Sequence, residues 1–174
     1  MPPVALSSDD VMAILQASER HPTLYEGRDQ APGGSGHALA RHYAITRNGA
    51  LGFFAAFRTM PDMAQAGIEV LNGPAGLWAR EQLFGQVATP QRPRGSHTGM
   101  RVVINHHGAW ICQVRYPGGT GSISIGTFRM VLDRIDDRPF GLHVHTFFPA
   151  LTLRVPTSHA EARYRDGKLF GRWP

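Results

Sequence analysis

The sequence predicts an α+β fold, in which helices come first and an antiparallel sheet follows. Between residues 37 and 86, apolar residues recur at helical spacing, broken by turn signals at Asn48-Gly49, Met60-Pro61 and Asn72-Gly73-Pro74. From Met100 onward, short apolar runs alternate with compact turns, which is the pattern of strands. Helices and strands that are segregated along the chain are typical of α+β domains.

Five helical segments are expected. The residues Ser7-Ser8-Asp9-Asp10 would cap the first helix, over residues 11–20, and His21-Pro22 would end it. A loop rich in glycine and proline follows over residues 22–36. The spacing then predicts helices at residues 36–45, 49–58, 61–72 and 75–85, and a basic loop over residues 88–99.

The second half reads as a meander of strands. Strands are expected at residues 100–105, 109–116, 122–132 and 141–148, joined by short connections at residues 106–108, 117–121 and 136–139. Connections this short favour antiparallel pairing. The first of them, His106-His107-Gly108, would be a tight turn with exposed histidines. A weaker pair of strands is expected at residues 151–155 and 162–170, around Asp166-Gly167.

Composition indicates one domain, or one domain with an arm, and a cationic surface. The chain has 174 residues, of which 42% are hydrophobic, and a formal net charge of +5. This is enough chain for a sizeable core. Because Lys168 is the only lysine, arginine supplies the charge, and arginine binds phosphate bidentately and stacks on bases. The surface would suit nucleic acid, although a GC-rich genome would produce the same bias.

The sequence excludes some classes of protein and gives no sign of others. Cys112 is the only cysteine, which excludes an internal disulfide framework and a cysteine-rich zinc site. No apolar run is long enough to span a membrane, and the first ten residues lack the basic-then-apolar pattern of a signal peptide. No P-loop, dinucleotide fingerprint or nucleophile elbow is present.

The segment with the most chemistry follows the glycine-rich turn at residues 33–36. It carries His37, Arg41 and His42, and the two histidines, five residues apart, would point about 140° apart on a helix. Histidine both takes and gives protons near neutral pH. His37 would lie in the first helical turn, where backbone N–H groups attract phosphate, and Arg41 would contact phosphate or solvent. The segment indicates phosphate chemistry.

Three segments together resemble one family. Residues 36–43, GHALARHY, look like the "GHxLxRHV" opening of the RNase A-like toxin domain of bacterial contact-dependent inhibition proteins. Residues 57–66, FRTMPDMAQA, resemble its "SxFxDxxTAxxA" segment, and residues 145–149, HTFFP, its closing "xTAYP" strand. Their order fits a toxin domain over residues 33–150. A helix and loop arm would precede it over residues 1–32, and an extension, expected to be a β-hairpin, would follow over residues 151–174.

The resemblance implies a toxin that cleaves RNA without a metal or cofactor. Its fold would be a helical lobe packed on a curved antiparallel sheet, as in RNase A-like (BECR-type) toxins, with the active site between them. The domain would be monomeric, delivered into the target-cell cytoplasm as part of a larger effector, and neutralised by an acidic immunity protein, whose charge would complement a basic site.

The resemblance also implies the site residues. It assigns the catalytic histidine to His42 and the threonine to Thr146. The family arginine is replaced by Phe53-Phe54 here, so we expect Arg47 or Arg58, on either side, to substitute. The family tyrosine is replaced by Phe148, and His145 or Tyr43 would supply its polar group. His37 would assist catalysis, and Arg41, Tyr43, His145 and Phe148 would bind substrate.

The strand carrying Thr146 poses a geometric question. Simple alternation puts His143 and His145 on one face and Thr146 on the other, unless a bulge intervenes. The spacing of the two histidines also suits a metal, but a third ligand would have to come from His97, His106 or His107. We therefore expect no metal here, and structural or solvent-facing histidines.

The leading hypothesis is thus a metal-independent endoribonuclease. An alternative is a catalytically degenerate domain of the same fold that binds RNA or protein, because phenylalanine fills two expected polar positions, Phe54 and Phe148. A third hypothesis is another enzyme on the same scaffold, such as a tRNA-specific nuclease or a nucleotide-processing toxin.

Overall fold

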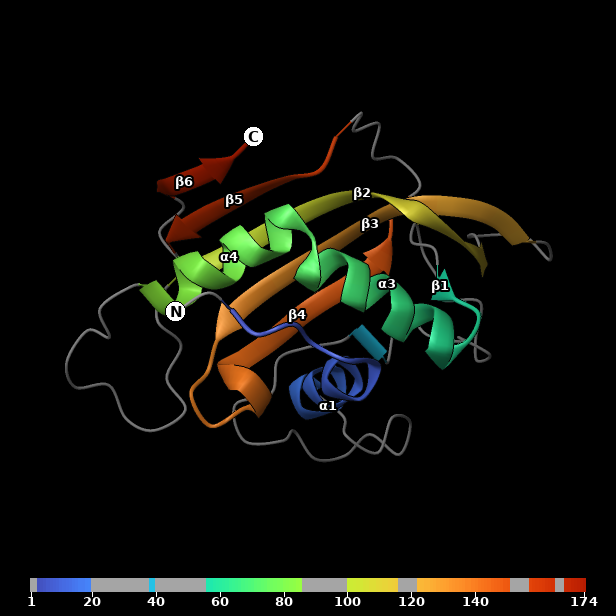
Figure 1. Ribbon diagram of the computed structural model, residues 1–174, viewed down its shortest axis with the longest axis horizontal. Helices are drawn as coiled ribbons and strands as arrows, with labels where there is room; N and C mark the ends of the chain where they lie inside the picture. The colour runs from blue at the N-terminus through green and yellow to red at the C-terminus, as the bar shows by residue number, and fades with distance from the viewer. Residues whose placement is uncertain are drawn as a thin grey trace.

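A computed structural model describes residues 3–19, 38–39, 56–85, 100–115, 122–150, 157–164 and 168–174. Within these residues, three longer helices accompany a six-stranded antiparallel sheet, and, apart from one two-residue strand, the helices precede the strands. The predicted α+β class is confirmed. Helices α3 and α4 lie across one face of the sheet, and α1 lies beside β4 (Figure 1).

Helix α1 spans Ser8–Ser18 and confirms the first expected helix. It begins with a capping box, in which the Ser7 hydroxyl accepts from the Asp10 N–H and the Asp10 carboxylate accepts from the Ser7 N–H. At its other end, the Ser18 hydroxyl accepts a hydrogen bond from the Val144 N–H (2.8 Å). This bond fixes α1 against strand β4.

Helices α3 (Met60–Asn72) and α4 (Pro74–Gly85) confirm the two expected at residues 61–72 and 75–85. Thr59 caps α3 by accepting from the Asp62 N–H, and Pro61 occupies its first turn. Gly76 allows the tight passage into α4, because a side chain there would meet the main chain of Val70 and Leu71.

The helix expected at residues 49–58 is wrong at its end. Ala56–Phe57 forms the short strand β1, which pairs with Arg115 and Val114 of β2. The Phe57 ring packs at 5.8 Å from the Phe128 ring and 5.0 Å from the Phe147 ring (centroid to centroid). Pairing and aromatic packing therefore override the helical spacing. Of the helix expected at residues 36–45, only Ala38 and Leu39 are described, and both are helical.

The sheet is built from β2 (Met100–Arg115), β3 (Ser122–Arg134), β4 (Leu142–Pro149), β5 (His159–Tyr164) and β6 (Leu169–Trp173). Its spatial order is β4-β3-β2-β5-β6, with β1 beside β2. A turn and a short 3₁₀ segment (Pro139–Gly141) join β3 to β4. The strands expected at 122–132 and 141–148 are confirmed.

The tight turn expected at His106-His107-Gly108 is wrong. The chain runs straight through it as one long strand, with His106 opposite Phe128 and His107 opposite Thr127, and the register shifts between His107 and Cys112. At this register shift, the Ala109 N–H donates a hydrogen bond to the Glu69 carboxylate of α3 (3.1 Å). The Glu69 side chain thus takes the place of a main-chain acceptor on the neighbouring strand. His106 is consequently buried, not exposed, whereas His107 is exposed.

The C-terminal strands lie elsewhere than expected. β5 begins at His159 and pairs with β2, and β6 pairs with β5, so this hairpin extends the main sheet. Residues 151–155 and Asp166-Gly167 lie outside the described residues. Gly171 of β6 packs under the Trp78 ring of α4, where a Cβ would lie 3.3 Å from the nearest ring atom.

The core lies between the sheet and the helices. The strand residues that face the helices are apolar and almost fully buried: Met100, Val102, Ile104, Phe128, Met130, Leu132, Leu142, Val144, Phe147, Ala160 and Ala162. Alternation sends their neighbours to the opposite side of the sheet, which we call the polar face. Its residues are Arg101, Asn105, Arg129, Asp133, His143, His145, Thr146, Phe148, His159, Glu161, Arg163 and Arg172.

No helix within the described residues is both long and apolar enough to cross a membrane.

Candidate active site on the polar face of the sheet

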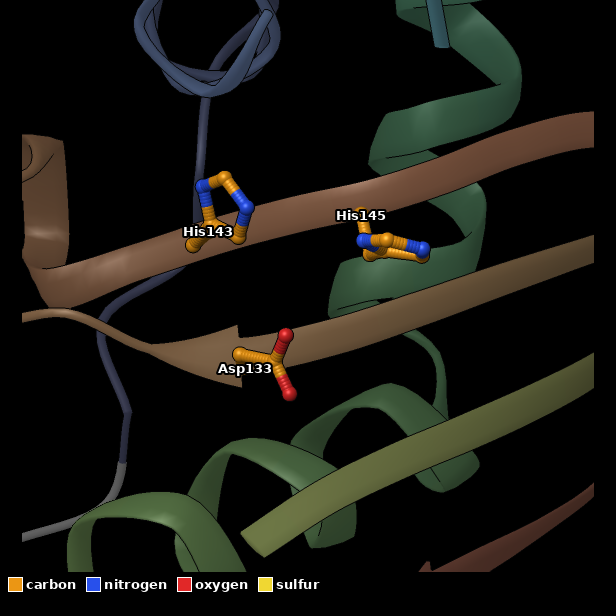
Figure 2. A group of neighbouring side chains, drawn as sticks. All are labelled: Asp133, His143 and His145. Carbon is orange, nitrogen blue, oxygen red and sulfur yellow. The ribbon is translucent and has the colours of Figure 1, made fainter. Parts of the chain in front are cut away.

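Three side chains that can bind protons or metal ions meet on the polar face. Asp133 comes from β3, and His143 and His145 come from β4. One ligand atom from each lies within 4.8 Å of the others. Figure 2 shows the three side chains gathered over these two strands. Asp133 and His143 are fully buried, and His145 is half-buried.

A β-bulge at His145 decides which residues reach this cluster. Val131 pairs with Thr146 and Leu132 pairs with Val144, so His145 is the extra residue of the bulge. The burial pattern agrees, since the helix-facing residues of β4 step from Val144 to Phe147. Because the bulge interrupts alternation, His145 and Thr146 both lie on the polar face. The conflict expected between Thr146 and the histidines is therefore resolved.

Arg101 holds the carboxylate of the cluster. It faces Asp133 across β2 and β3, donating from Nε to Oδ1 (3.1 Å) and from Nη2 to Oδ2 (2.8 Å). The Asp133 side chain is 0% exposed and the Arg101 side chain is 37% exposed. The hydrogen bond to Asp133 raises the pKa of Arg101. Two-point pairing of this kind fixes the guanidinium plane beside the histidines.

The surroundings of His145 disfavour its protonated form. Burial lowers its pKa from the ordinary value of 6.5, and the positive charge of Arg101 lowers it further, against the opposing effect of Asp133. A neutral imidazole keeps a free lone pair at neutral pH. His145 can therefore accept a proton or bind a metal ion.

Thr146 carries a buried hydroxyl beside the cluster. Its side chain is 9% exposed, and its Oγ1 makes no hydrogen bond to any described residue. An unsatisfied buried hydroxyl costs about 1–3 kcal/mol. A water molecule, an ion or a ligand could satisfy a hydroxyl of this kind.

Charged side chains continue along the polar face away from the cluster. Arg129 Nε donates to Asn105 Oδ1 (2.7 Å), and the Asn105 amide lies 2.7 Å from His159 Nε2. On β5, the Glu161 carboxylate accepts from Arg163 and from Arg172 of β6. Together with Arg101 and Asp133, the described part of this face carries four guanidinium groups and two carboxylates, and its net charge is positive.

The residues expected in the site fall into two groups. Thr146, His145 and Phe148 lie together on β4, and Phe148 is half-exposed beside Arg129. Arg58 is exposed just after β1. Phe57, which precedes it, packs against Phe128 and Phe147 on the helix-covered side of the sheet. The other expected residues lie outside the described residues: His37, Arg41, His42, Tyr43 and Arg47.

One contact connects Leu39 to the end of α1. The Leu39 N–H donates to the Glu19 carboxylate (2.9 Å), and Glu19 directly follows Ser18, which accepts from the Val144 N–H. Val144 lies between the two histidines of β4. Leu39 is therefore anchored at the end of α1 that contacts β4.

The sequence reading missed Asp133 and Arg101. Arg101 lies in the strand expected at residues 100–105, and Asp133 directly follows the strand expected at residues 122–132. Their contact depends on the strand register, because Arg101 and Asp133 are 32 residues apart. The third possible metal ligand beside His143 and His145 is the Asp133 carboxylate and not one of the histidines expected from the sequence. Carboxylates bind Zn²⁺ as imidazoles do.

Comparisons of the chain with protein-family models, with curated proteins and with solved structures give no match.

Proposed function

We propose that the protein is a metal-independent endoribonuclease of the RNase A-like toxin type. The observation that carries the proposal is the bulge at His145, which puts an imidazole and the Thr146 hydroxyl on the same face as Arg101. An imidazole, a guanidinium and a hydroxyl donor are the groups that RNA cleavage needs. The resemblance at residues 36–43 and 145–149 supplies the assignment to toxins.

RNA can be cleaved by its own 2′-hydroxyl, so no metal-activated water is required. The 2′-oxygen attacks phosphorus, the bond to the 5′-oxygen breaks, and a cyclic phosphate forms. One imidazole takes the 2′-hydroxyl proton and a second protonates the departing 5′-oxygen. In this proposal His42 and His145 are the two imidazoles, and His37, five residues before His42 in the sequence, assists them.

Charge builds up on the phosphoryl oxygens during this step. Arg101 is the described cation beside His145, and its pairing with Asp133 fixes its orientation in advance. Thr146 donates its hydroxyl to a phosphoryl oxygen. Arg47 and Arg58, predicted from sequence, would then contact phosphates beyond the reacting one, together with Arg41.

The contact between Leu39 and Glu19 supports a composite site. It anchors Leu39, three residues before His42 in the sequence, at the end of α1, and Ser18 anchors the same end to β4. Two imidazoles from distant parts of the chain would thereby share one site. Tyr43 and Phe148 are the aromatic side chains proposed to stack on bases.

The net positive charge of the polar face favours a polyanionic substrate. Arg129, Arg163 and Arg172 lie on the strands that continue from the site. Binding of RNA should weaken steeply as salt rises, because each phosphate contact releases counterions. In this proposal an acidic immunity protein covers the same surface, and the toxin domain reaches the target-cell cytoplasm within a larger effector.

The test is digestion of a fluorophore-labelled RNA in the presence of EDTA. Wild-type protein should cut it, and His42→Ala and His145→Gln should each slow cleavage by about 10²–10⁴-fold, the usual contribution of an acid or base. His107→Gln, at an exposed histidine outside the cluster, is the matched control and should cut normally. Intact RNA with every variant and with wild type would exclude the activity.

A binding role without cleavage is the second candidate, and Phe148 favours it. The family tyrosine position is apolar here, and Phe148 shares the polar face with Arg129. The same labelled RNA distinguishes the two in a fluorescence anisotropy titration. Salt-sensitive binding that weakens in Arg129→Ala, without cleavage, would select the binding role.

A further inference from the structure

The cluster of Asp133, His143 and His145 has the composition of a transition-metal site. It offers two imidazoles and one carboxylate, with ligand atoms within 4.8 Å of one another. The sequence had suggested the spacing of the two histidines, and the strand register adds the carboxylate. A site formed by three such groups is unlike the scattered histidines of a protein surface, because two of its members are fully buried.

We propose that Asp133, His143 and His145 bind one Zn²⁺ ion per chain, and that this ion inhibits the proposed RNA cleavage. The binding itself does not depend on the proposed function, whereas the inhibition does. Zn²⁺ is favoured over Mg²⁺ and Ca²⁺ because two of the three donors are imidazole nitrogens, and the latter ions prefer oxygen ligands.

The geometry is close to what Zn²⁺ requires. Ligand atoms at about 2.0–2.1 Å from a tetrahedral ion are about 3.3 Å apart, so the cluster must contract from its 4.8 Å spread. His145 can make this movement, because it is the least buried member and occupies the bulge. Three protein ligands leave a fourth position for water.

Arg101 acts as an outer partner of the site. It uses one lone pair on each oxygen of Asp133, and a carboxylate oxygen has a second lone pair for the metal. Outer hydrogen bonds of this kind orient metal-binding carboxylates. The guanidinium charge opposes the ion, so affinity should fall below that of a closed four-ligand zinc site.

Metal binding and proton transfer use the same atom in this proposal. A nitrogen of His145 that binds Zn²⁺ has no lone pair left for the 2′-hydroxyl proton. Zinc should therefore block cleavage, and EDTA should restore it. This is opposite to a metal-dependent nuclease, which EDTA would inactivate.

The experiment is calorimetric titration of chelator-treated, full-length protein with Zn²⁺. Wild type and His107→Ala should each bind one more equivalent than His145→Ala, or bind at least tenfold more tightly. Co²⁺ should give the intense visible absorption of a tetrahedral site in wild type and lose it in His145→Ala. Circular dichroism checks that each variant is folded, and Asp133→Asn provides a second test in variants that fold.

The outcomes separate the two proposals. Zinc binding that is unchanged in folded His145→Ala, or absent in wild type, overturns the metal site even if RNA is cut in EDTA. Zinc binding with no cleavage under any condition keeps the site and removes the ribonuclease. Cleavage that zinc leaves unaffected, in protein shown to hold the ion, overturns the inhibition.

Discussion

Arg101 and Asp133, 32 residues apart in sequence, form a two-point ion pair across β2 and β3 in which the carboxylate is completely buried. The pair organises the polar face, because it fixes a cation and an anion beside His143 and His145. A buried carboxylate that loses its partner is much costlier than an exposed one.

Arg101→Ala should therefore destabilise the fold clearly. Removing one member of a buried pair costs about 3–5 kcal/mol, and we expect the lower end or less, because the Arg101 side chain is 37% exposed. Urea unfolding measures the loss. The matched control is Arg163→Ala, which removes an exposed partner of Glu161 and should cost less than about 1 kcal/mol. Equal losses in the two variants would contradict a structural role for the pair.

Thr146→Val should separate stability from activity. The Thr146 hydroxyl is buried and makes no hydrogen bond to a described residue, so replacing it with a methyl group should leave stability unchanged or raise it by up to about 1 kcal/mol. The proposed donor to phosphate is lost, and RNA cleavage should fall. Thr146→Ser keeps the hydroxyl and should retain activity. A loss of stability above about 1 kcal/mol would show that the hydroxyl is already satisfied.

His106 should make the fold less stable in mild acid. Burial lowers its pKa below the ordinary 6.5, and the charge of His107 also lowers it, against the opposing effect of Glu69. The unfolded chain thus binds the proton more readily than the folded chain, so the free energy of unfolding falls as the pH drops through about 6.5. One histidine contributes a slope of at most about 1.4 kcal/mol per pH unit.

The measurement for His106 is urea unfolding at several pH values between 7.5 and 5. His106→Gln should show a shallower decline than wild type. His107→Gln removes only the smallest cause of the lowered His106 pKa, so its curve should stay much closer to wild type than that of His106→Gln. A wild-type slope retained in His106→Gln would assign the acid sensitivity to other groups.

Gly76→Ala should damage the junction of α3 and α4. A Cβ at this position would meet the Val70 carbonyl and would lie 2.8 Å from the Leu71 carbonyl carbon, and these are main-chain atoms that cannot rotate away. Overpacking of this kind costs about 1–3 kcal/mol. Gly85→Ala, at the end of the same helix with open space around it, should be neutral or slightly stabilising. Thermal unfolding compares the two.

Local patterns in the sequence were enough to locate most of the elements. The Ser7 cap, the Asn72-Gly73-Pro74 break and the apolar alternation of β3 and β4 each act within a few residues. Helices α1, α3 and α4 and strands β3 and β4 could therefore be predicted. The predicted elements were wrong where contacts with distant parts of the chain outweigh the local preference for a helix or a turn. Phe57 lies in a strand because it pairs with β2 and packs against the rings of Phe128 and Phe147. His106 lies in a strand because this part of β2 pairs with β3.

The sequence by itself determined the α+β class, the arginine-based positive charge and the placement of Thr146 and His145 on one strand. Only the tertiary structure decided that these two side chains share a face, because a single bulge reverses the alternation. It also decided that Asp133 and Arg101 join them, because pairing between strands brings together residues that no local spacing relates. Local periodicity depends on backbone geometry, which neighbouring residues set, whereas register and bulges depend on how whole strands pack.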